Sequence, residues 1–374
     1  MVAAQHNPPD TPRPTRVRPP TEAPPLLCTL VLAALVAAPD GPTLKDGDRV
    51  VLVGGTMIER EQAYGYLEAT IAANLPDTNI TYRNLGWSGD TVRGEAQAGF
   101  GSAADGFKHL KEHVATLKPT VILVGVGANE SFAGAAGLAD FERDLKVYLD
   151  MLAATGARLA LLGPTRMEDM GRPLPDPVAH NRDLRLYSDA IAKVAASRGD
   201  RFIELYQDVL AKPGRHLTEN GIHLNAEGYR RLAEVVARGL GVDPSPATIA
   251  PGTASAAIGP RCVRADKLPA GVYRLSVGGE MIALADADGW ALGVETTRGV
   301  ALRNLIVAKD RLYFHRWRPE NETYLFGFRK HEQGNNAREI PEFDPLVAKL
   351  ETEIAALRAP TTQSYTLKKL EVPR

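Results

Sequence analysis

Between residues 49 and 240, short apolar runs alternate with longer stretches in which apolar residues recur at helical spacing. The short runs predict buried strands at 49–53, 121–126 and 158–162, with weaker strand patterns at 80–82 and 201–205. The longer stretches predict amphipathic helices, whose apolar stripes begin at Tyr64, Phe107, Leu138, Leu184 and Tyr229. Strands that are apolar on both faces need helices on both sides. The alternation therefore predicts an α/β fold with a covered parallel sheet.

Glycine and polar residues gather in four loops next to these elements. They are residues 54–57 after the first strand, 84–91 after the second, 125–130 after the third and 217–225 before the last helix. Sheets of this kind bind ligands beyond the carboxyl ends of their strands. We therefore expect the four loops to form one site.

The loops supply a hydroxyl, a glycine, an asparagine and a histidine, which are the parts of an acyl-transfer site. The Thr56 hydroxyl would attack a carbonyl carbon, and His223 would take its proton and pass it to the leaving group. The backbone N–H groups of Gly89 and Thr56 and the side-chain amide of Asn129 would donate to the oxyanion.

The same loops, in the same order, resemble the sequence blocks of the SGNH (GDSL-type) esterase/lipase family. Its Gly-Asp-Ser-Leu block corresponds to 54–57, its Asn-x-x-x-x-Gly-x-Thr block to 84–91, its Gly-x-Asn block to 127–129 and its Asp-x-x-His block to 220–223. The resemblance covers residues 49–240. It implies a flavodoxin-like three-layer α/β/α sandwich and the hydrolysis of esters, often acyl lipids or O-acetylated sugars, with no metal or cofactor.

Two positions differ from the family pattern. Thr56 stands where the family has its serine nucleophile; the attacking oxygen is the same, but the β-methyl group restricts χ1. Asn220 stands where the family has the aspartate that orients the histidine, and an amide does not stabilise an imidazolium as a carboxylate does. Glu219 is a candidate replacement for that carboxylate; alternatively, His223 acts alone.

The site residues also have structural interpretations. Thr56 and Glu59 fit a capping box at a helix start. Gly89 and Asn129 are common turn residues, and His223 can be a packing histidine. The four blocks in order favour the catalytic interpretation.

Other motifs are less specific. Ser88 is a substitute nucleophile candidate, although the family uses its block for oxyanion contacts. His109-x-x-Glu-His113 fits a zinc-protease pattern, but it lies on a predicted helix whose apolar neighbours face the core, so we interpret it as a solvated face. Residues 168–177 form a Pro-rich loop that is either a substrate-contact loop or a plain connector. No phosphate-loop or dinucleotide fingerprint occurs.

The composition and the N-terminal sequence indicate which binding partners and which cellular compartment to expect. Lys and Arg (44) balance Asp and Glu (45), so we expect no nucleic-acid partner. The two cysteines, Cys28 and Cys262, exclude a disulfide framework and a Cys-rich zinc site. Residues 1–25 contain eight prolines and predict disorder, and arginines followed by the apolar run 26–38 predict a signal peptide and export. That run is too short to span a bilayer, so we expect no integral membrane span after cleavage of residues 1–38.

The expected domain order places the hydrolase-like domain at 39–242, followed by a Pro/Gly/Ala-rich linker at 243–260. A small β-rich module with a terminal helix follows at 261–358, and a loose tail at 359–374.

Within the module, runs at 271–277 and 281–285 flank two glycines and predict a hairpin. Residues 305–307 and 311–315 have strand character. The aromatic and polar residues after Arg316 favour domain packing, or alternatively a carbohydrate-facing surface. The terminal helix is predicted from one apolar stripe at helical spacing, formed by Leu346, Leu350, Ile354 and Leu357.

Together these patterns predict an exported SGNH-type ester hydrolase. The preferred substrate is an O-acyl, chiefly O-acetyl, ester of a sugar or polysaccharide, hydrolysed through an acyl-enzyme on Thr56. The alternatives are a non-catalytic binding protein of the same fold, for carbohydrate or protein, and a lipid esterase. The oligomeric state stays open.

Overall fold

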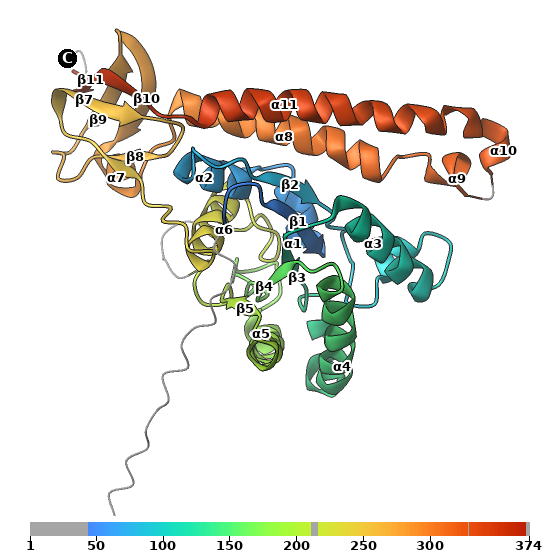
Figure 1. Cartoon of the computed structure of the whole chain (residues 1–374). Coiled ribbons are helices and arrows are strands. Elements are labelled where there is room, and N and C mark those ends of the chain that lie inside the picture. Colours follow the sequence, from blue (N-terminus) through green and yellow to red (C-terminus); the bar gives the residue numbers. More distant parts are fainter. Residues whose placement is uncertain (1–43, 211–215, 328, 372–374) are drawn as a thin grey trace, which may run out of the picture. The chain divides into compact units, whose positions relative to one another are not determined.

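A computed structural model describes residues 44–210, 216–327 and 329–371 of the chain. Its central element is a five-stranded parallel sheet in the order β2-β1-β3-β4-β5 (Figure 1). The strands are β1 (Arg49–Gly54), β2 (Thr81–Asn84), β3 (Val121–Gly125), β4 (Arg158–Leu162) and β5 (Arg201–Ile203). This is the flavodoxin-like order, which confirms the predicted fold class. The predicted leader and its cleavage site lie outside the described residues.

Helices cover both faces of the sheet, as the apolar strands require. One face packs against α2 (Tyr66–Asn74) and α6 (Ala226–Gly239). The other packs against α3 (Ala103–Leu117), α4 (Gly134–Ala153) and α5 (Val178–Arg198). Strand side chains alternate between the two cores, so the fold is a three-layer sandwich.

The chain order reverses between β1 and β3, and this reversal places the ligand site. Chains leaving two such neighbouring strands diverge, which opens a crevice at their carboxyl ends. The strands end side by side at Gly54 and Gly125. A β-carbon on Gly54 would lie 2.1 Å from the Gly125 carbonyl oxygen, and its φ is +144°, so only glycine fits there. The first and third loops consequently begin next to each other.

The C-terminal region contains an antiparallel sheet in the order β10-β9-β11-β7. Its strands are β7 (Gly252–Ile258), β9 (Val272–Val277), β10 (Glu280–Asp286) and β11 (Thr361–Lys369). The predicted hairpin at 271–285 is confirmed by β9 and β10. A two-stranded parallel sheet of β6 (Ala247–Thr248) and β8 (Val263–Arg264) and the short helix α7 (Ala287–Leu292) complete this region.

Two expectations for this region are wrong. The linker expected at 243–260 contains β6 and β7, and the loose tail expected at 359–374 contains β11, which pairs with both β7 and β9. The physical reason is distance along the chain, because β11 gains its partners from strands about one hundred residues earlier. The domain boundaries themselves stay a prediction.

A helical hairpin separates β10 from β11 in the sequence. Its long helices, α8 (Thr297–Trp317) and α11 (Phe343–Arg358), lie side by side in Figure 1. The short helices α9 (Glu322–Leu325), α10 (Lys330–Gln333) and η3 (Gly334–Glu342) connect them. The predicted terminal helix is confirmed, but the strands expected at 305–307 and 311–315 are wrong. The buried side chains of α8 include Leu302, Ile306, Tyr313 and Trp317, whose helical spacing overrides the short β-like runs.

The hairpin covers β2, the edge strand of the parallel sheet. Arg83 of β2 binds Glu351 of α11, with Nη1 2.6 Å from Oε1. Lys309 of α8 is fully buried and forms an ion pair with Glu68 of α2. An edge strand that is covered in this way cannot pair with another chain.

Among the described helices, none is long and apolar enough to cross a membrane.

Candidate active site

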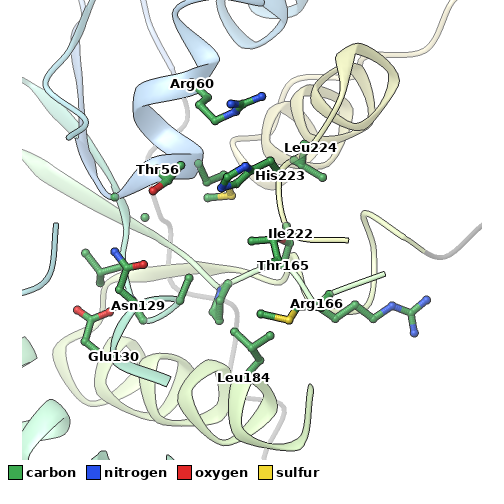
Figure 2. A pocket seen from close by; sticks show the side chains of 18 of the residues that line it. Thr56, Arg60, Asn129, Glu130, Thr165, Arg166, Leu184, Ile222, His223 and Leu224 are labelled. Atoms are coloured by element: carbon green, nitrogen blue, oxygen red, sulfur yellow. Dashed lines mark hydrogen bonds between the residues drawn. The ribbon is translucent and has the colours of Figure 1, made fainter. Parts of the chain in front are cut away.

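The four predicted loops converge on one cavity of about 110 Å³ at the carboxyl ends of the strands. Figure 2 shows Thr56, Asn129 and His223 around it, on three different segments of the chain. Gly89 lies next to it, because its N–H binds Thr56. The structure therefore brings together residues that are up to 167 positions apart in the sequence.

Thr56 is the first residue of the short helix α1 (Thr56–Glu61). Its Oγ1 accepts a hydrogen bond from the Gly89 N–H at 3.2 Å. The capping-box interpretation is wrong, because Gly55 occupies the N-cap position and no side chain caps the helix. The Thr56 hydroxyl is thus available to the cavity, and its own N–H lies in the first turn, where backbone donors lack helical acceptors.

Gly89 binds Thr56, and Asn129 lines the same cavity as Thr56. Gly89 has a φ of +80°, a conformation that favours glycine and aims its N–H at the Thr56 oxygen. Asn129 donates from Nδ2 to the Asp90 carbonyl oxygen at 2.8 Å, which leaves its second Nδ2 proton for another acceptor. The backbone N–H of Gly89 and the side-chain amide of Asn129 are therefore hydrogen-bond donors where an oxyanion would form.

Glu130, next to Asn129, ties the second and third loops together. One carboxylate oxygen accepts from the Val92 N–H and the other from the Gly127 N–H, both at 2.9 Å. Burial raises the pKa of Glu130, and these hydrogen bonds oppose the rise. Sequence reasoning did not single out Glu130 as a residue that holds the loops.

Asn220 contacts His223 through its amide nitrogen. Its Oδ1 accepts from the backbone N–H groups of Ile222 and His223, at 3.1 and 2.9 Å. These two donors fix the amide orientation, so Nδ2 faces Nδ1 of the His223 ring at 3.3 Å. Asn220 therefore donates to His223, whereas an aspartate would accept from it.

This contact sets the tautomer of the neutral His223 ring. Because Nδ1 accepts the amide proton, the ring proton lies on Nε2. A general base would need the opposite arrangement, with Nε2 free to accept the hydroxyl proton. Both His223 and Thr56 line the cavity. Among the described hydrogen bonds, however, none joins the two side chains.

Glu219 is directed away from His223. Its carboxylate binds Arg60 Nη2 at 2.8 Å and the Tyr64 hydroxyl at 2.9 Å. The hydrogen bond from Tyr64, followed by the charge of Arg60, lowers the pKa of Glu219. In this arrangement the carboxylate does not occupy the place of the missing aspartate.

Arg60 and Glu219 nevertheless act on His223 through space. Burial is the largest cause that lowers the pKa of His223, the positive charge of Arg60 lowers it further, and Glu219 opposes both. Arg60 also lines the cavity, four residues after Thr56 on α1. Helical spacing from Thr56 is the signal by which the sequence could have revealed it.

The Pro-rich loop at 168–177 supports the histidine loop. Glu168 accepts from the Leu217 and Thr218 N–H groups, both at 3.0 Å, and from the Thr218 hydroxyl at 2.7 Å. Its own N–H donates to the Gly221 carbonyl oxygen at 2.8 Å. Glu168 thus holds the segment that presents Asn220.

A second histidine, His180 of α5, lines the cavity and was not found from the sequence. Its Nε2 is 3.1 Å from the Ser131 hydroxyl, which itself donates to the Ala128 carbonyl oxygen at 2.6 Å. His180 must therefore donate to Ser131, and the two do not form a nucleophile–base pair. The ring also stacks on Phe132, with centroids 4.2 Å apart.

The remaining candidates lie elsewhere. Ser88 donates its backbone N–H to Glu59 and is not among the described residues that line the cavity. His109 contacts the Gln97 carbonyl oxygen, and His113 packs against Trp317. Within the described residues, no group of three His, Cys, Asp or Glu side chains could hold a metal ion.

Residues 52–231 match the GDSL-like Lipase/Acylhydrolase family, over the same loops that form the cavity. These residues form a GDSL-like lipase/acylhydrolase domain. The match supports a hydrolase of carboxylic esters. A comparison with curated protein sequences found no match.

The chain is also similar to solved structures, at low sequence identity. BT4096, a gut microbial diltiazem-metabolizing enzyme, has a TM-score of 0.60 and 14% identity, over 88% of this chain and 100% of that chain. The acetylxylan esterase Axe2 from Geobacillus stearothermophilus has a TM-score of 0.44 and 18% identity, over 55% of this chain and 99% of its own. The first similarity extends beyond the GDSL-like domain, so it includes part of the C-terminal region.

Proposed function

We propose that this GDSL-like hydrolase removes acetyl groups from O-acetylated carbohydrates, with Thr56 as its nucleophile. The observation that carries the proposal is the Gly89 N–H bound to Thr56 Oγ1 at 3.2 Å, at the wall of a small cavity that also holds His223. A hydroxyl beside a backbone donor can attack a carbonyl whose oxygen then moves to that donor.

The reaction would run in two steps. In the tautomer that carries its proton on Nδ1, His223 takes the hydroxyl proton at Nε2 as Thr56 Oγ1 bonds to the acetyl carbon, and the oxyanion receives hydrogen bonds from Gly89 and Asn129. This tautomer forms when the contact between Asn220 Nδ2 and His223 Nδ1 breaks. When the bond to the sugar oxygen breaks, that oxygen takes the proton from His223. Water then hydrolyses the acetyl-Thr56 ester and releases acetate, with His223 again accepting and returning a proton.

The size of the cavity favours a short acyl group. Its volume of about 110 Å³ is far below the roughly 300–1,000 Å³ of pockets that hold drug-sized ligands. A long fatty acyl chain would need a larger apolar channel. This observation disfavours the lipid-esterase alternative.

The stacked rings at the cavity favour a sugar as the alcohol part. Phe132 is 67% exposed and stacks on His180 at 4.2 Å, so its other face is open to solvent. An open aromatic face packs well against the C–H face of a pyranose ring. Arg166, which also lines the cavity, can donate to sugar hydroxyls.

The experiment compares acyl length and alcohol type. The full chain should hydrolyse p-nitrophenyl acetate faster than p-nitrophenyl octanoate, and should release acetate from acetylated xylo-oligosaccharides. Phe132→Ala should raise KM for the oligosaccharide while leaving KM for p-nitrophenyl acetate unchanged. A preference for octanoate, or equal effects of Phe132→Ala on both acetates, would contradict the proposal.

A second candidate is a binding protein that keeps the fold without turnover. The amide proton that Asn220 donates to His223 Nδ1 favours it, because this contact disfavours the base-competent tautomer. Binding of acetylated oligosaccharide with no acetate release would support this candidate.

We also propose that residues 1–38 direct export.

A further inference from the structure

The end of helix α8 reaches residues 84–91, the oxyanion loop that carries Gly89. Helix α8 itself lies outside the family domain at 52–231. Arg318, the residue after α8, binds Glu59 of α1, with Nη1 2.9 Å from Oε1. The two side chains are 26% and 15% exposed. This ion pair is therefore largely shielded from water, where such pairs are stronger than on an open surface.

The second oxygen of Glu59 holds the backbone of the oxyanion loop. Oε2 accepts from the Ser88 N–H, directly before Gly89. The loop also lies against α1, because a β-carbon on Gly86 would be 2.3 Å from the Glu59 nitrogen. One carboxylate thus joins the helix that carries Thr56 to the loop that carries Gly89.

Arg318 also contacts the loop directly. Its guanidinium lies over the Trp87 ring, 3.5 Å from the centroid. Trp317 packs edge-on against the same ring, with centroids 5.7 Å apart. The loop is consequently held at two neighbouring residues, Trp87 and Ser88.

We propose that Arg318 is a positioning residue, which fixes Glu59 and Trp87 so that the Gly89 N–H stays aimed at the oxyanion. The inference rests on the proposed function for its catalytic consequence. Without the cation, Glu59 is free to rotate into solvent and release Ser88. The donor at Gly89 would then sample other directions, and a donor that must reorganise stabilises the transition state less.

The chain offers a matched control two residues away. Arg316 binds Asp344 of α11 at the same 2.9 Å, but this pair lies within the helical hairpin. Arg318→Gln should lower kcat for p-nitrophenyl acetate about 10-fold with KM within twofold of the native value, which is a fraction of the 10²–10³ that a lost oxyanion donor costs. Arg316→Gln should change neither constant, and Arg318→Lys should restore part of kcat. A KM effect without a kcat effect, or equal losses in both Gln variants, would overturn the proposal.

A double variant tests whether Arg318 acts through Glu59. Glu59→Gln should lower kcat to a similar extent, and the double variant should lose no more than Arg318→Gln alone. Losses that multiply in the double variant would show independent effects and would overturn the proposed route.

Hydrogen exchange tests the positioning claim without any activity. Arg318→Gln should increase deuterium uptake in a peptide covering residues 84–91, whereas Arg316→Gln should not. If the native protein hydrolysed no ester, the proposed function would fail while this comparison still decided the role of Arg318. Equal uptake in the two variants would overturn that role.

Discussion

At the scale of single residues, the amide of Asn220 determines which nitrogen of His223 carries the proton. Its oxygen accepts two backbone N–H groups, so its nitrogen must face the ring. A carboxylate at the same place would keep the backbone hydrogen bonds and accept the Nδ1 proton as well. Replacing the amide nitrogen of Asn220 with a carboxylate oxygen would thus turn His223 from a hindered general base into a competent one.

Asn220→Asp should therefore raise kcat for p-nitrophenyl acetate. In serine proteases with a Ser-His-Asp triad, the reverse exchange lowers turnover about 10⁴-fold, so we expect a gain of at least about 10² here. Asn304→Asp is the control, because Asn304 is exposed on α8 and none of the described hydrogen bonds uses its side chain. Equal rates in the two variants would contradict the tautomer argument.

The pH profile should report the lowered pKa of His223. The neutral ring is the active form, so a pKa below the usual 6.5 keeps activity at lower pH. The acid limb of kcat/KM should therefore fall below pH 6.5. Arg60→Gln removes a charge that disfavours the imidazolium and should shift the limb upward; an unchanged limb would show that another group titrates.

The chemistry of the site could be predicted from the sequence, but its internal contacts could not. Thr56, Gly89, Asn129 and His223 were found because their types and order form a pattern. The direction of Glu219 toward Arg60 and Tyr64 depends on side-chain contacts across 155 positions or more, which no local pattern encodes.

At the scale of elements, the strands and helices from 49 to 240 follow from apolar periodicity, because packing on both faces of the sheet leaves that signature. The Pro-rich loop shows where periodicity stops being informative. Its Glu168 binds residues about fifty positions later, and both segments are irregular. Neither prediction for this loop, substrate contact or plain connector, included that support.

Glu168→Ala should loosen the histidine loop. It leaves the Leu217 and Thr218 N–H groups without their acceptor, which should cost about 2 kcal/mol in the free energy of unfolding and lower kcat about 10-fold. Asp169→Ala is the control, because the Asp169 carboxylate accepts only from the Gly171 N–H among its described hydrogen bonds. Urea denaturation and p-nitrophenyl acetate kinetics measure both effects; equal losses in the two variants would contradict the account.

At the scale of the whole described chain, the C-terminal region was the least predictable part. The strands expected at 305–307 and 311–315 are helical, and the expected tail contributes β11 to a sheet. In both cases the decisive partners are distant in sequence. The helix α8 is selected by its packing against α2 and β2, where Lys309 lies between Glu68 and Asp310.

Lys309→Met should destabilise the protein by about 3–5 kcal/mol, because it leaves two buried carboxylates without their cation. Burial already raises the pKa of Glu68 to about 7. Lys349→Met on the exposed side of α11 should change the free energy of unfolding by less than about 0.5 kcal/mol. Urea denaturation compares the two; similar small effects would show that the buried pair does not anchor α8.

The most direct test of the account is to find which residue becomes acetylated during turnover. The full chain would be mixed with p-nitrophenyl acetate, quenched in acid and analysed by peptide mass spectrometry, beside Thr56→Ala and Thr56→Ser. We predict an acetyl group on Thr56 or on its serine replacement, and loss of both adduct and turnover in Thr56→Ala. Native-like turnover in Thr56→Ala, or an adduct on another residue, would contradict the central claim.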